Sequence, residues 1–359
     1  MISTGRLSME IYDNFRWGGK MPKVLFLYYD PHYLHSAFAQ AIGADFLSSD
    51  FVATWTKSKK IQIHKKILGV LAPSLLLPKD YDIYLCEGSF ILPVIAKKLR
   101  LQPKRGKIVN FIADPLVYYL HTGVIKGAKR SVLLNLLREV DGFICISEME
   151  KELLLEFVNK PAIVVDPFIR DKLYKRYMSI SPDLASHNIV FVARGPDWFY
   201  KGVDLLVDGF NIAKKEISEL RLNIVGEWEP KKEWLVNGVK FVGQQKNLAP
   251  YFKRSSLYVH VGRGEAFGIS VLEAMLSGLP AMVSKWTGAK TVAEKLGRNF
   301  VSDIKAEDVA EKIMKYFDLN LEKRKALSRK AKALASDYSR EKKVKLFVER
   351  FQKLVEETK

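Results

Sequence analysis

Two glutamates eight positions apart, Glu265 and Glu273, lie in the stretch "GRGEAFGISVLEAMLSGLP", residues 262–280. A strand-like run, "SLYVHV" (256–261), precedes the first glutamate, and an apolar helix-like run carries the second. Ligands of open α/β sheets bind outside the carboxyl ends of the strands, so Glu265 is expected in a ligand crevice. A carboxylate accepts two hydrogen bonds at once from vicinal hydroxyls. One glutamate can therefore hold a sugar and the other a nucleoside, unless this is only a surface loop before a half-buried helix.

The glycine between the two glutamates points to an anion. Gly268 has no Cβ, so a ligand can approach the backbone there, and the free N–H groups of the following helix face the same place. Together with the helix dipole, these donors suit a phosphate group. Gly278 is expected to end the helix and Pro280 to lead into the next strand. The joint pattern is far more specific than two glutamates at this spacing alone.

A second stretch, "FVARGPDWFYKGVDLLVDGF" (191–210), supplies cations. It reads as a strand, then Arg194, a loop, and Lys201 and Gly202 at the start of an amphipathic helix. An arginine fork and a lysine point charge suit a diphosphate. Their charge would also stabilise a leaving phosphate as negative charge grows on it. If this stretch is considered by itself, the alternative interpretation is that Arg194 and Lys201 are two surface cations beside a turn.

These residues need a scaffold, and the chain alternates strand-like with helix-like runs from Lys23 onward. Short runs rich in Val, Ile and aromatic residues, separated by helices, are typical of a parallel sheet covered on both faces. The expected strands of the first half are 23–29, 81–88, 107–114 and 140–147. The pattern fades over 164–188, the expected linker, and restarts at Asn188. The sequence thus predicts an α/β protein with two doubly wound domains.

Length and cysteine content agree with two folded domains. A chain of 359 residues exceeds the size of one ordinary core. Its two cysteines, Cys86 and Cys145, lie in apolar runs and provide neither a disulfide framework nor a zinc set. The first 21 residues lack the apolar block of a secretory signal, and no run of about 18 uncharged apolar residues is present. We therefore expect a cytoplasmic setting.

The net charge of +18 favours anionic partners. No acidic residue lies between Asp50 and Asp80, and lysines there alternate with Ile, Leu and Val in a basic segment, residues 57–78. Such a segment resembles an interfacial helix on an anionic membrane. A solvated helix face with an ordinary apolar core stripe explains it equally well. We expect peripheral attachment to the cytoplasmic face of a membrane, and an acceptor that is lipid-linked or otherwise membrane-associated.

Taken together, these stretches resemble the retaining nucleotide-sugar glycosyltransferases of the GT-B fold, in the large group 1 family typified by sucrose synthase and bacterial mannosyltransferases. The resemblance is strong from about Asn188 to Phe300 and continues into "REVDGFICISEMEKELL" in the first half. It implies two Rossmann-like domains facing each other across a cleft. Residues 1–168 would bind the acceptor and residues 169–339 the nucleotide sugar. The apolar-striped helix 340–359 would pack back on the first domain.

Carried over to this sequence, the resemblance implies a donor site in the second domain. Arg194 and Lys201 would bind the diphosphate and, with Glu265, form the catalytic set. Glu265 would contact the hexose, and Glu273 would hold the ribose. The backbone at Phe267 and Gly268 would serve phosphate or sugar, and Gly243 and Gln244 would lie in the loop that contacts the base. No cofactor is implied beyond the substrate, a nucleotide-diphosphate sugar such as UDP- or GDP-hexose.

Three departures from the family pattern stand out. The loop after the first strand reads "YYDPHYLHS" in place of a Gly-Gly pair, and "TGAKT" (287–291) lacks the glutamate of Gly-Gly-x-x-Glu. Asp114 stands where a histidine often follows a middle strand, as an acceptor contact or as a turn former before Pro115. We expect His32, His35 and His121 to be structural or surface residues. The resemblance implies no obligatory metal, so metal independence is expected.

The expected function is the retaining, metal-independent transfer of a hexose from a nucleotide-diphosphate sugar. In the front-face mechanism proposed for this family, the leaving diphosphate takes the acceptor proton and domain closure brings the substrates together. An epimerase or a phosphorylase of the same architecture is one alternative, although no lysine stands out for pyridoxal phosphate. A non-enzymatic nucleic-acid-binding protein is another, but the lysines are dispersed, and no nucleic acid is expected as a partner.

Overall fold

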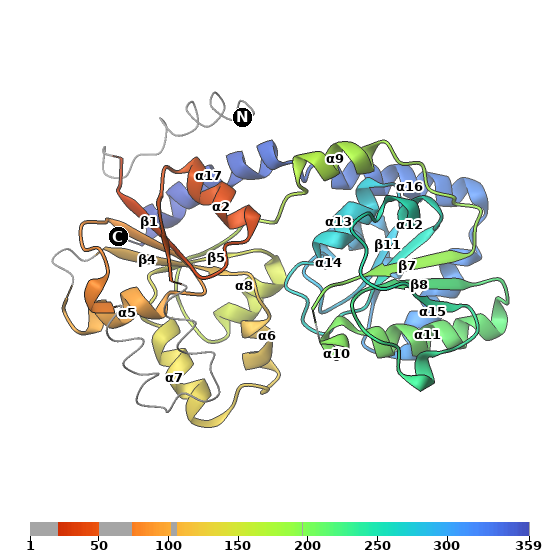
Figure 1. The fold of residues 1–359 in the computed structure, drawn as a ribbon, viewed down its shortest axis with the longest axis horizontal. Helices are drawn as coiled ribbons and strands as arrows, with labels where there is room; N and C mark the ends of the chain where they lie inside the picture. Colours follow the sequence, from red (N-terminus) through yellow and green to blue (C-terminus); the bar gives the residue numbers. More distant parts are fainter. Residues whose placement is uncertain (1–20, 50–73, 102–105, 196, 359) are drawn as a thin grey trace. The chain divides into compact units, whose positions relative to one another are not determined.

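The computed structural model describes residues 21–49, 74–101, 106–195 and 197–358. The chain divides into two compact units. The first unit comprises residues 1–146, 150–166 and 341–359, and the second unit comprises residues 147–149 and 167–340. The chain therefore passes from the first unit to the second and returns to the first at its last helix (Figure 1).

The first unit contains a six-stranded parallel sheet in the order β2-β1-β3-β4-β5-β6. Its strands are β1 (Val24–Tyr28), β2 (Asp45–Ser48), β3 (Ile83–Glu87), β4 (Lys107–Ile112), β5 (Gly142–Cys145) and β6 (Ala162–Val164). Its helices include α2 (Tyr33–Ala41), α5 (Ile91–Lys98), α6 (Leu116–His121), α7 (Gly127–Leu137), α8 (Glu148–Leu155) and α17 (Arg340–Glu357). The central strands are almost wholly buried, as in a sheet covered on both faces.

Helix α17 closes the core of the first unit. Its apolar stripe includes Phe347 and Phe351, both fully buried. The Phe347 ring stacks on Phe38 of α2 with centroids 4.6 Å apart, and on Phe111 of β4 at 6.4 Å. A Cβ at Gly142 of β5 would lie 3.1 Å from the Leu354 side chain. The last helix of the chain thus packs against elements from its first 150 residues.

The second unit contains another six-stranded parallel sheet, in the order β12-β11-β10-β7-β8-β9. Its strands are β7 (Asn188–Val192), β8 (Arg221–Val225), β9 (Val239–Phe241), β10 (Leu257–His260), β11 (Ala281–Ser284) and β12 (Val301–Ser302). Read from β7, this is the order of the doubly wound nucleotide-binding fold, in which the strand order reverses between the first and fourth strands. The reversal here lies between β7 and β10.

Helices cover both faces of the second sheet. Its α-helices are α9 (Asp171–Met178), α10 (Trp198–Lys201), α11 (Val203–Glu216), α12 (Ala249–Lys253), α13 (Ile269–Leu276), α14 (Lys290–Ala293), α15 (Ala306–Phe317) and α16 (Leu321–Ala335). Short 3-10 turns are η1 (Lys232–Trp234), η2 (Glu294–Leu296) and η3 (Arg298–Phe300). Helices α11 and α15 pack together, whereas α13 packs with α16 and α9 (Figure 1).

The predicted class, an α/β protein with two doubly wound parallel sheets, is confirmed. The expected linker over 164–188 is wrong in one respect, because α9 forms inside it. Its sequence, "DKLYKRYM", fully buries only Tyr177, so its apolar face is too short to reveal a helix from the sequence. Lys57, Lys59, Lys60, Lys65 and Lys66 of the basic segment lie outside the described residues.

Candidate functional site

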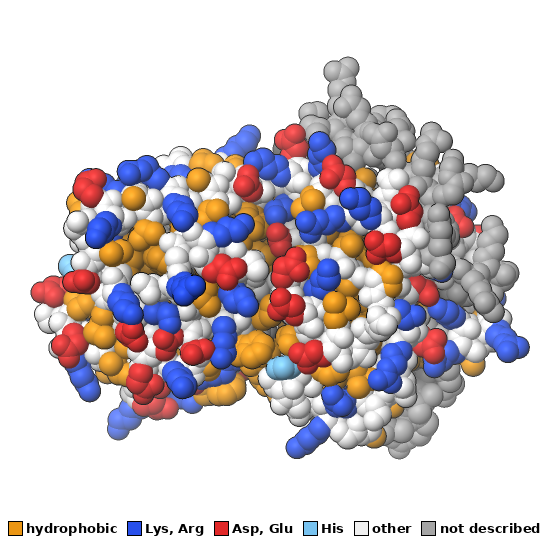
Figure 2. Space-filling model, turned by 180° about the vertical axis from the view of Figure 1, so that it is seen from behind, with side chains coloured by type: hydrophobic (Ala, Val, Ile, Leu, Met, Phe, Trp, Pro, Cys, Tyr) orange, Lys and Arg blue, Asp and Glu red, His pale blue; other side chains and the backbone are white. Residues whose placement is uncertain are grey.

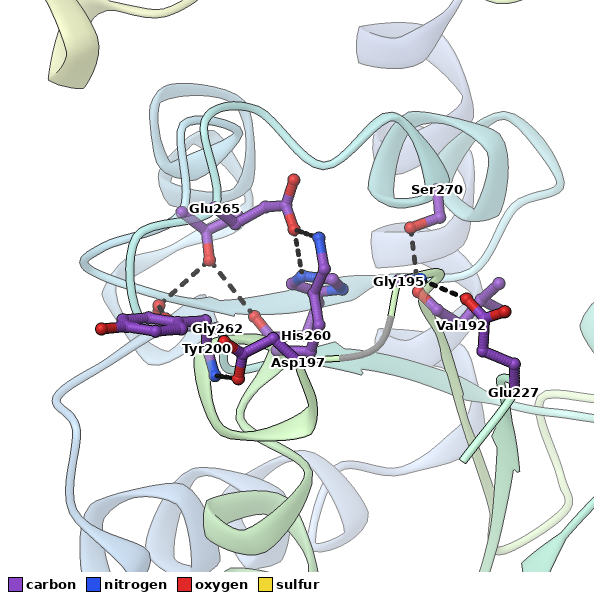
Figure 3. A network of polar contacts seen from close by, with 12 residues as sticks. Val192, Gly195, Asp197, Tyr200, Glu227, His260, Gly262, Glu265 and Ser270 are labelled. Carbon is purple, nitrogen blue, oxygen red and sulfur yellow. Dashed lines mark hydrogen bonds and ion pairs between the residues drawn. The ribbon is translucent and has the colours of Figure 1, made fainter. Parts of the chain in front are cut away.

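The candidate site lies at the strand-order reversal of the second sheet. Strands β7 and β10 are neighbours there, with Leu257 paired to Ile189 and Tyr258 to Val190. The loop after β7 carries Arg194 and Lys201, and the loop after β10 carries Glu265. Because the strands are parallel, both loops leave the same edge of the sheet (Figure 3). This is where ligands bind in doubly wound folds.

Backbone contacts fix the loop after β7. The Gly195 N–H donates to Glu227 Oε1 at 2.6 Å, which joins this loop to the end of β8. Asp197 caps the short helix α10 by accepting from the Tyr200 N–H at 3.3 Å. Helix α10 ends at Lys201, so this cation is the last residue before the chain turns.

Gly202 makes that turn. It has φ of +73° and serves both as the C-cap of α10 and as the N-cap of α11. A Cβ at Gly202 would lie 2.0 Å from the Val261 carbonyl oxygen, so only glycine fits. Val261 directly follows β10. The close approach therefore places Lys201 beside the loop that carries Glu265.

Lys201 and Glu265 form an ion pair. Lys201 Nζ donates to Glu265 Oε2 at 2.6 Å, and the side chains are 27% and 16% exposed. The same oxygen lies 3.5 Å from His260 Nε2, at the outer limit of a hydrogen bond. Burial raises the pKa of Glu265, but the hydrogen bond from His260 and the charge of Lys201 outweigh it and lower the pKa to about 2. Glu265 is therefore a carboxylate at neutral pH.

The backbone of Glu265 is held from the neighbouring strand end. Its N–H donates to the Trp286 carbonyl at 3.0 Å, and its carbonyl accepts from the Gly288 N–H at 2.9 Å. A Cβ at Gly288 would lie 2.0 Å from the Ala266 carbonyl oxygen. Thus "TGAKT", which lacks the family's glutamate, supports the Glu265 loop through its backbone.

Gly268 is the N-cap of helix α13 and has φ of +89°, a backbone conformation that favours glycine. The preceding Phe267 is buried, and its carbonyl accepts from the Ala289 N–H at 2.9 Å. Helix α13 then runs for eight residues to Leu276. The first turn of α13 lies at the same edge of the sheet as Glu265. Its N–H groups could therefore bind an anion at this edge.

Glu273 lies on α13 and is half-buried. Burial raises its pKa to about 7, against the opposing charges of Arg194 and Arg170. Burial also raises the pKa of Tyr177 on α9, with a further contribution from Glu273. Arg194 itself is exposed. The structure thus brings Arg194 into electrostatic range of Glu273, while Lys201 pairs with Glu265.

His260 is a site residue that the sequence reasoning missed. It is the last residue of β10 and is 1% exposed. Its Nδ1 lies 3.4 Å from the Tyr258 hydroxyl, which contacts Ser270 Oγ at 2.8 Å and the Val192 carbonyl at 3.1 Å. A histidine ending an otherwise apolar strand at the ligand-binding edge is the signal that could have revealed it.

The expected base-contacting residues lie further along the same edge. Gly243 and Gln244 are exposed, in the loop between β9 and α12. The Gly226 N–H, at the end of β8, donates to the Gly243 carbonyl at 3.3 Å. Strand β9 lies two strands from β7 and three strands from β10, the strand that leads to Glu265.

Residues singled out in the first unit have local partners. Asp114 Oδ1 accepts from the Leu116 N–H at 3.0 Å, which is the turn-forming role. Buried His35 places Nδ1 2.7 Å from Glu87 Oε1, which also accepts from the His32 N–H at 3.1 Å. His121 Nδ1 lies 2.8 Å from Glu156 Oε2. The two cysteines are buried and are not joined in a disulfide bond.

Two kinds of feature are missing from the described residues. Within them, no cluster of three or more His, Cys, Asp or Glu side chains could hold a metal ion. Nor does any helix of the described ranges combine the length and apolar character needed to cross a bilayer.

Comparisons with known proteins agree with this geometry. Residues 186–318 match the sequence profile of the family described as "Glycosyl transferases group 1". Phosphatidyl-myo-inositol mannosyltransferase of Mycobacterium leprae is 26% identical over 189 residues, covering 47% of this chain and 49% of that protein. An uncharacterized glycosyltransferase of Haemophilus influenzae is 26% identical over 167 residues, covering 43% and 46%. The chain thus spans about half the length of these curated relatives.

Solved structures share the fold over almost the whole chain. Sucrose-phosphate synthase of Thermosynechococcus elongatus has a TM-score of 0.67 at 15% identity, covering 93% of this chain and 99% of that one. Anabaena HepE in complex with UDP and glucose has a TM-score of 0.63 at 15% identity, with coverage of 93% and 99%.

The fold is therefore that of the GT-B proteins, with two parallel six-stranded α/β sheets. Together with the family match and the curated relatives, this makes the chain a relative of the group 1 glycosyltransferases. The resemblance predicted from the sequence is confirmed.

Proposed function

We propose that this protein is a retaining glycosyltransferase that moves a hexose from a nucleotide-diphosphate sugar to an acceptor. The observation that carries the proposal is the Lys201–Glu265 pair at the strand-order reversal, beside the N-terminus of α13. A cation, a carboxylate and helix N–H groups at one strand edge match the diphosphate and hydroxyls of such a donor. The family match covers the same residues, 186–318.

In the proposed donor complex, each group has one task. Arg194 and Lys201 bind the diphosphate and stabilise the charge that develops on it as the sugar leaves. Glu265 accepts hydrogen bonds from the hexose, and the backbone at Phe267 and Gly268 faces the phosphate or sugar. Glu273 accepts from the ribose hydroxyls, and Gly243 and Gln244 contact the base. The leaving diphosphate takes the acceptor proton, so the front-face reaction requires no enzyme nucleophile.

Binding of the donor is the first test. A thermal-shift series with UDP, GDP, ADP and their sugars should raise the melting temperature with one base, because a ligand at about 100 times its Kd adds about 2.7 kcal/mol of stability. UDP is the first choice, since HepE was crystallised with UDP and with UDP-glucose. No shift with any nucleotide or sugar nucleotide would contradict the proposal. A product of inverted anomeric configuration, read by NMR, would contradict retention.

For the acceptor, we propose a lipid-linked or membrane-associated glycan bound by the first unit, with the protein attached to the cytoplasmic face of a membrane. The support is the basic segment 57–78 and the M. leprae relative, named for phosphatidyl-myo-inositol. Reversing Lys59, Lys60, Lys65 and Lys66 to Glu should abolish sedimentation with vesicles of anionic lipid. Matched reversal of Lys323, Lys325, Lys330 and Lys345 is the control. Equal vesicle binding by both variants would refute the attachment.

The surface gives less support to nucleic-acid binding. On the face of the molecule shown in Figure 2, Lys and Arg side chains are interspersed with Asp and Glu. Binding along a nucleic-acid backbone favours a continuous basic groove with aromatic side chains for stacking. Salt-dependent binding of random oligonucleotides without any binding of sugar nucleotides would reverse this preference.

A further inference from the structure

His260 lies directly beside the carboxylate of Glu265. Its Nε2 is 3.5 Å from Oε2, the same oxygen that accepts from Lys201 Nζ at 2.6 Å (Figure 3). The other carboxylate oxygen points away from the His260 ring (Figure 3). This oxygen of Glu265 is therefore bonded to Lys201, while a second nitrogen, on the buried ring, lies within 3.5 Å and makes no hydrogen bond.

The imidazole ring is held independently of Lys201. Its Nδ1 faces the Tyr258 hydroxyl at 3.4 Å, and the Phe191 ring lies 5.3 Å away at an angle of 31°. The Tyr258 hydroxyl in turn contacts Ser270 of α13 and the Val192 carbonyl of β7. The ring is thus anchored to β7, β10 and α13, whatever partner the lysine takes.

The hydrogen-bonding capacity of both side chains limits what His260 can do. An ionised carboxylate only accepts, so His260 Nε2 must carry a proton to bond Glu265. This is met by the neutral tautomer that is protonated at Nε2, and also by the imidazolium, which donates from both nitrogens. In either form, the Nε2–H group of His260 can donate to the Glu265 carboxylate.

Binding of a diphosphate would change the partners of Glu265. If Lys201 turns to a phosphate oxygen, Glu265 loses its cation while it remains largely buried. A buried carboxylate that loses its partner is costly unless another donor remains. We propose that His260 is a positioning residue that keeps Glu265 directed at the sugar when Lys201 engages the diphosphate. This inference rests on the proposed function and deepens it, because it names what orients the sugar-binding carboxylate.

The test compares nucleotides with and without the sugar. The affinities of UDP and UDP-glucose, or of GDP and GDP-mannose if only that pair binds the wild type, are measured by calorimetry. His260→Phe keeps a ring beside Phe191 but removes the donor, and His260→Gln restores a donor. His187→Phe is the control, because this second histidine of the unit lies before β7, stacked on Phe317 at 5.3 Å.

The expected result separates positioning from structural damage. His260→Phe should keep UDP affinity within about twofold and weaken UDP-glucose about tenfold, and His260→Gln should recover most of that loss. Adding Glu265→Gln to His260→Phe should cause little further loss, because both changes remove one coupled interaction. His187→Phe should bind both ligands like the wild type.

Three outcomes would overturn the inference. His260→Phe could retain full UDP-glucose affinity, it could lose UDP and UDP-glucose to the same degree, or His260→Gln could fail to recover the loss. These leave the proposed function intact, since the wild type still binds the sugar nucleotide. If the wild type binds none of UDP, GDP, ADP and their sugars, the proposed function fails and the role of His260 fails with it.

Discussion

Lys201 Nζ lies 2.6 Å from Glu265 Oε2 although 64 positions separate the two residues in the chain. They meet because β7 and β10 are neighbours at the strand-order reversal and because Gly202 touches the backbone after β10. The cation proposed for the diphosphate is thus paired with the carboxylate proposed for the sugar. Donor binding has to exchange one partner for the other.

Replacing Glu265 with Gln should separate binding from turnover. The change frees Lys201, so we expect UDP to bind about two- to fivefold more tightly, while sugar transfer falls about 100-fold or more because a group directed at the reacting sugar is lost. Calorimetry with UDP and steady-state rates give the two numbers. Glu311→Gln, which breaks an exposed ion pair with Lys315, is the control. Undiminished transfer by Glu265→Gln would rule out its proposed role.

The raised pKa of Glu273 predicts a pH-dependent affinity. Burial raises this pKa to about 7, so half of the molecules carry a neutral Glu273 near that pH. If the carboxylate holds the ribose, UDP-glucose should bind about tenfold more tightly at pH 8 than at pH 6. The esterified diphosphate of UDP-glucose does not titrate in this range. Glu273→Gln should flatten the profile, and an equal slope in this variant would assign the dependence to another group.

Glu265 should contribute to resistance against acid. Its pKa falls from the ordinary glutamate value of 4.5 to about 2 in the folded protein, despite the opposing effect of burial. A lowered carboxyl pKa stabilises the fold above pH 4.5, and this stabilisation disappears as pH falls towards 2. The melting temperature of the wild type should therefore drop more steeply than that of Glu265→Gln between about pH 5 and pH 3. Parallel curves for the two proteins would show that the ion pair does not stabilise the fold.

Gly202→Ala should be far more damaging than alanine at a glycine of similar backbone conformation. The new methyl would lie 2.0 Å from the Val261 carbonyl, and φ is +73°. At Gly243, φ is +69° but a Cβ would meet nothing within 4 Å. Gly243→Ala should thus cost about 1 kcal/mol of unfolding free energy, and Gly202→Ala about 2–3 kcal/mol more. Similar denaturant midpoints for the two variants would contradict the close approach.

Phe347→Ala tests the return of the chain to the first unit. Phe347 is fully buried between Phe38 and Phe111, so its removal should cost about 3–5 kcal/mol in unfolding of that unit. Lys345→Ala, on the exposed side of α17, should cost almost nothing. A cost below about 1 kcal/mol for Phe347→Ala would show that α17 contributes little to this core. Hydrogen exchange of β1 and β4 amides reads the effect locally.

Much of this architecture could be predicted because apolar periodicity marks the buried strands and striped helices. The runs that led to β1, β3, β4, β5, β7 and β10 bury nearly every residue, that of β8 buries its three apolar residues, and α17 shows a single apolar stripe. The short strands β2, β6 and β12 were not predicted, because two to four residues are too few to show a strand pattern. Helix α9 escaped because its surface is mostly polar.

At the site, the sequence indicated the residue types but not their pairing. Glu265 and Lys201 were each expected at strand ends, yet each was expected to face the ligand, and their mutual ion pair depends on sheet order. Arg194 was grouped with Lys201, whereas the structure places its charge within range of Glu273. His260 was hidden because a single polar residue in an apolar strand reads as part of the core.

The return of the last helix to the first unit has a practical consequence for dissecting the protein. One cut near residue 167 would strip the first sheet of α17 and uncover the aromatic surface around Phe38 and Phe111. Two cuts, near residues 167 and 340, would separate the second unit, which carries Lys201, Glu265 and His260. To complete the first unit, residues 341–358 would then have to be joined to the segment that ends near residue 166. For expression of separate parts, the second unit is thus best treated as an insertion within the sequence of the first unit.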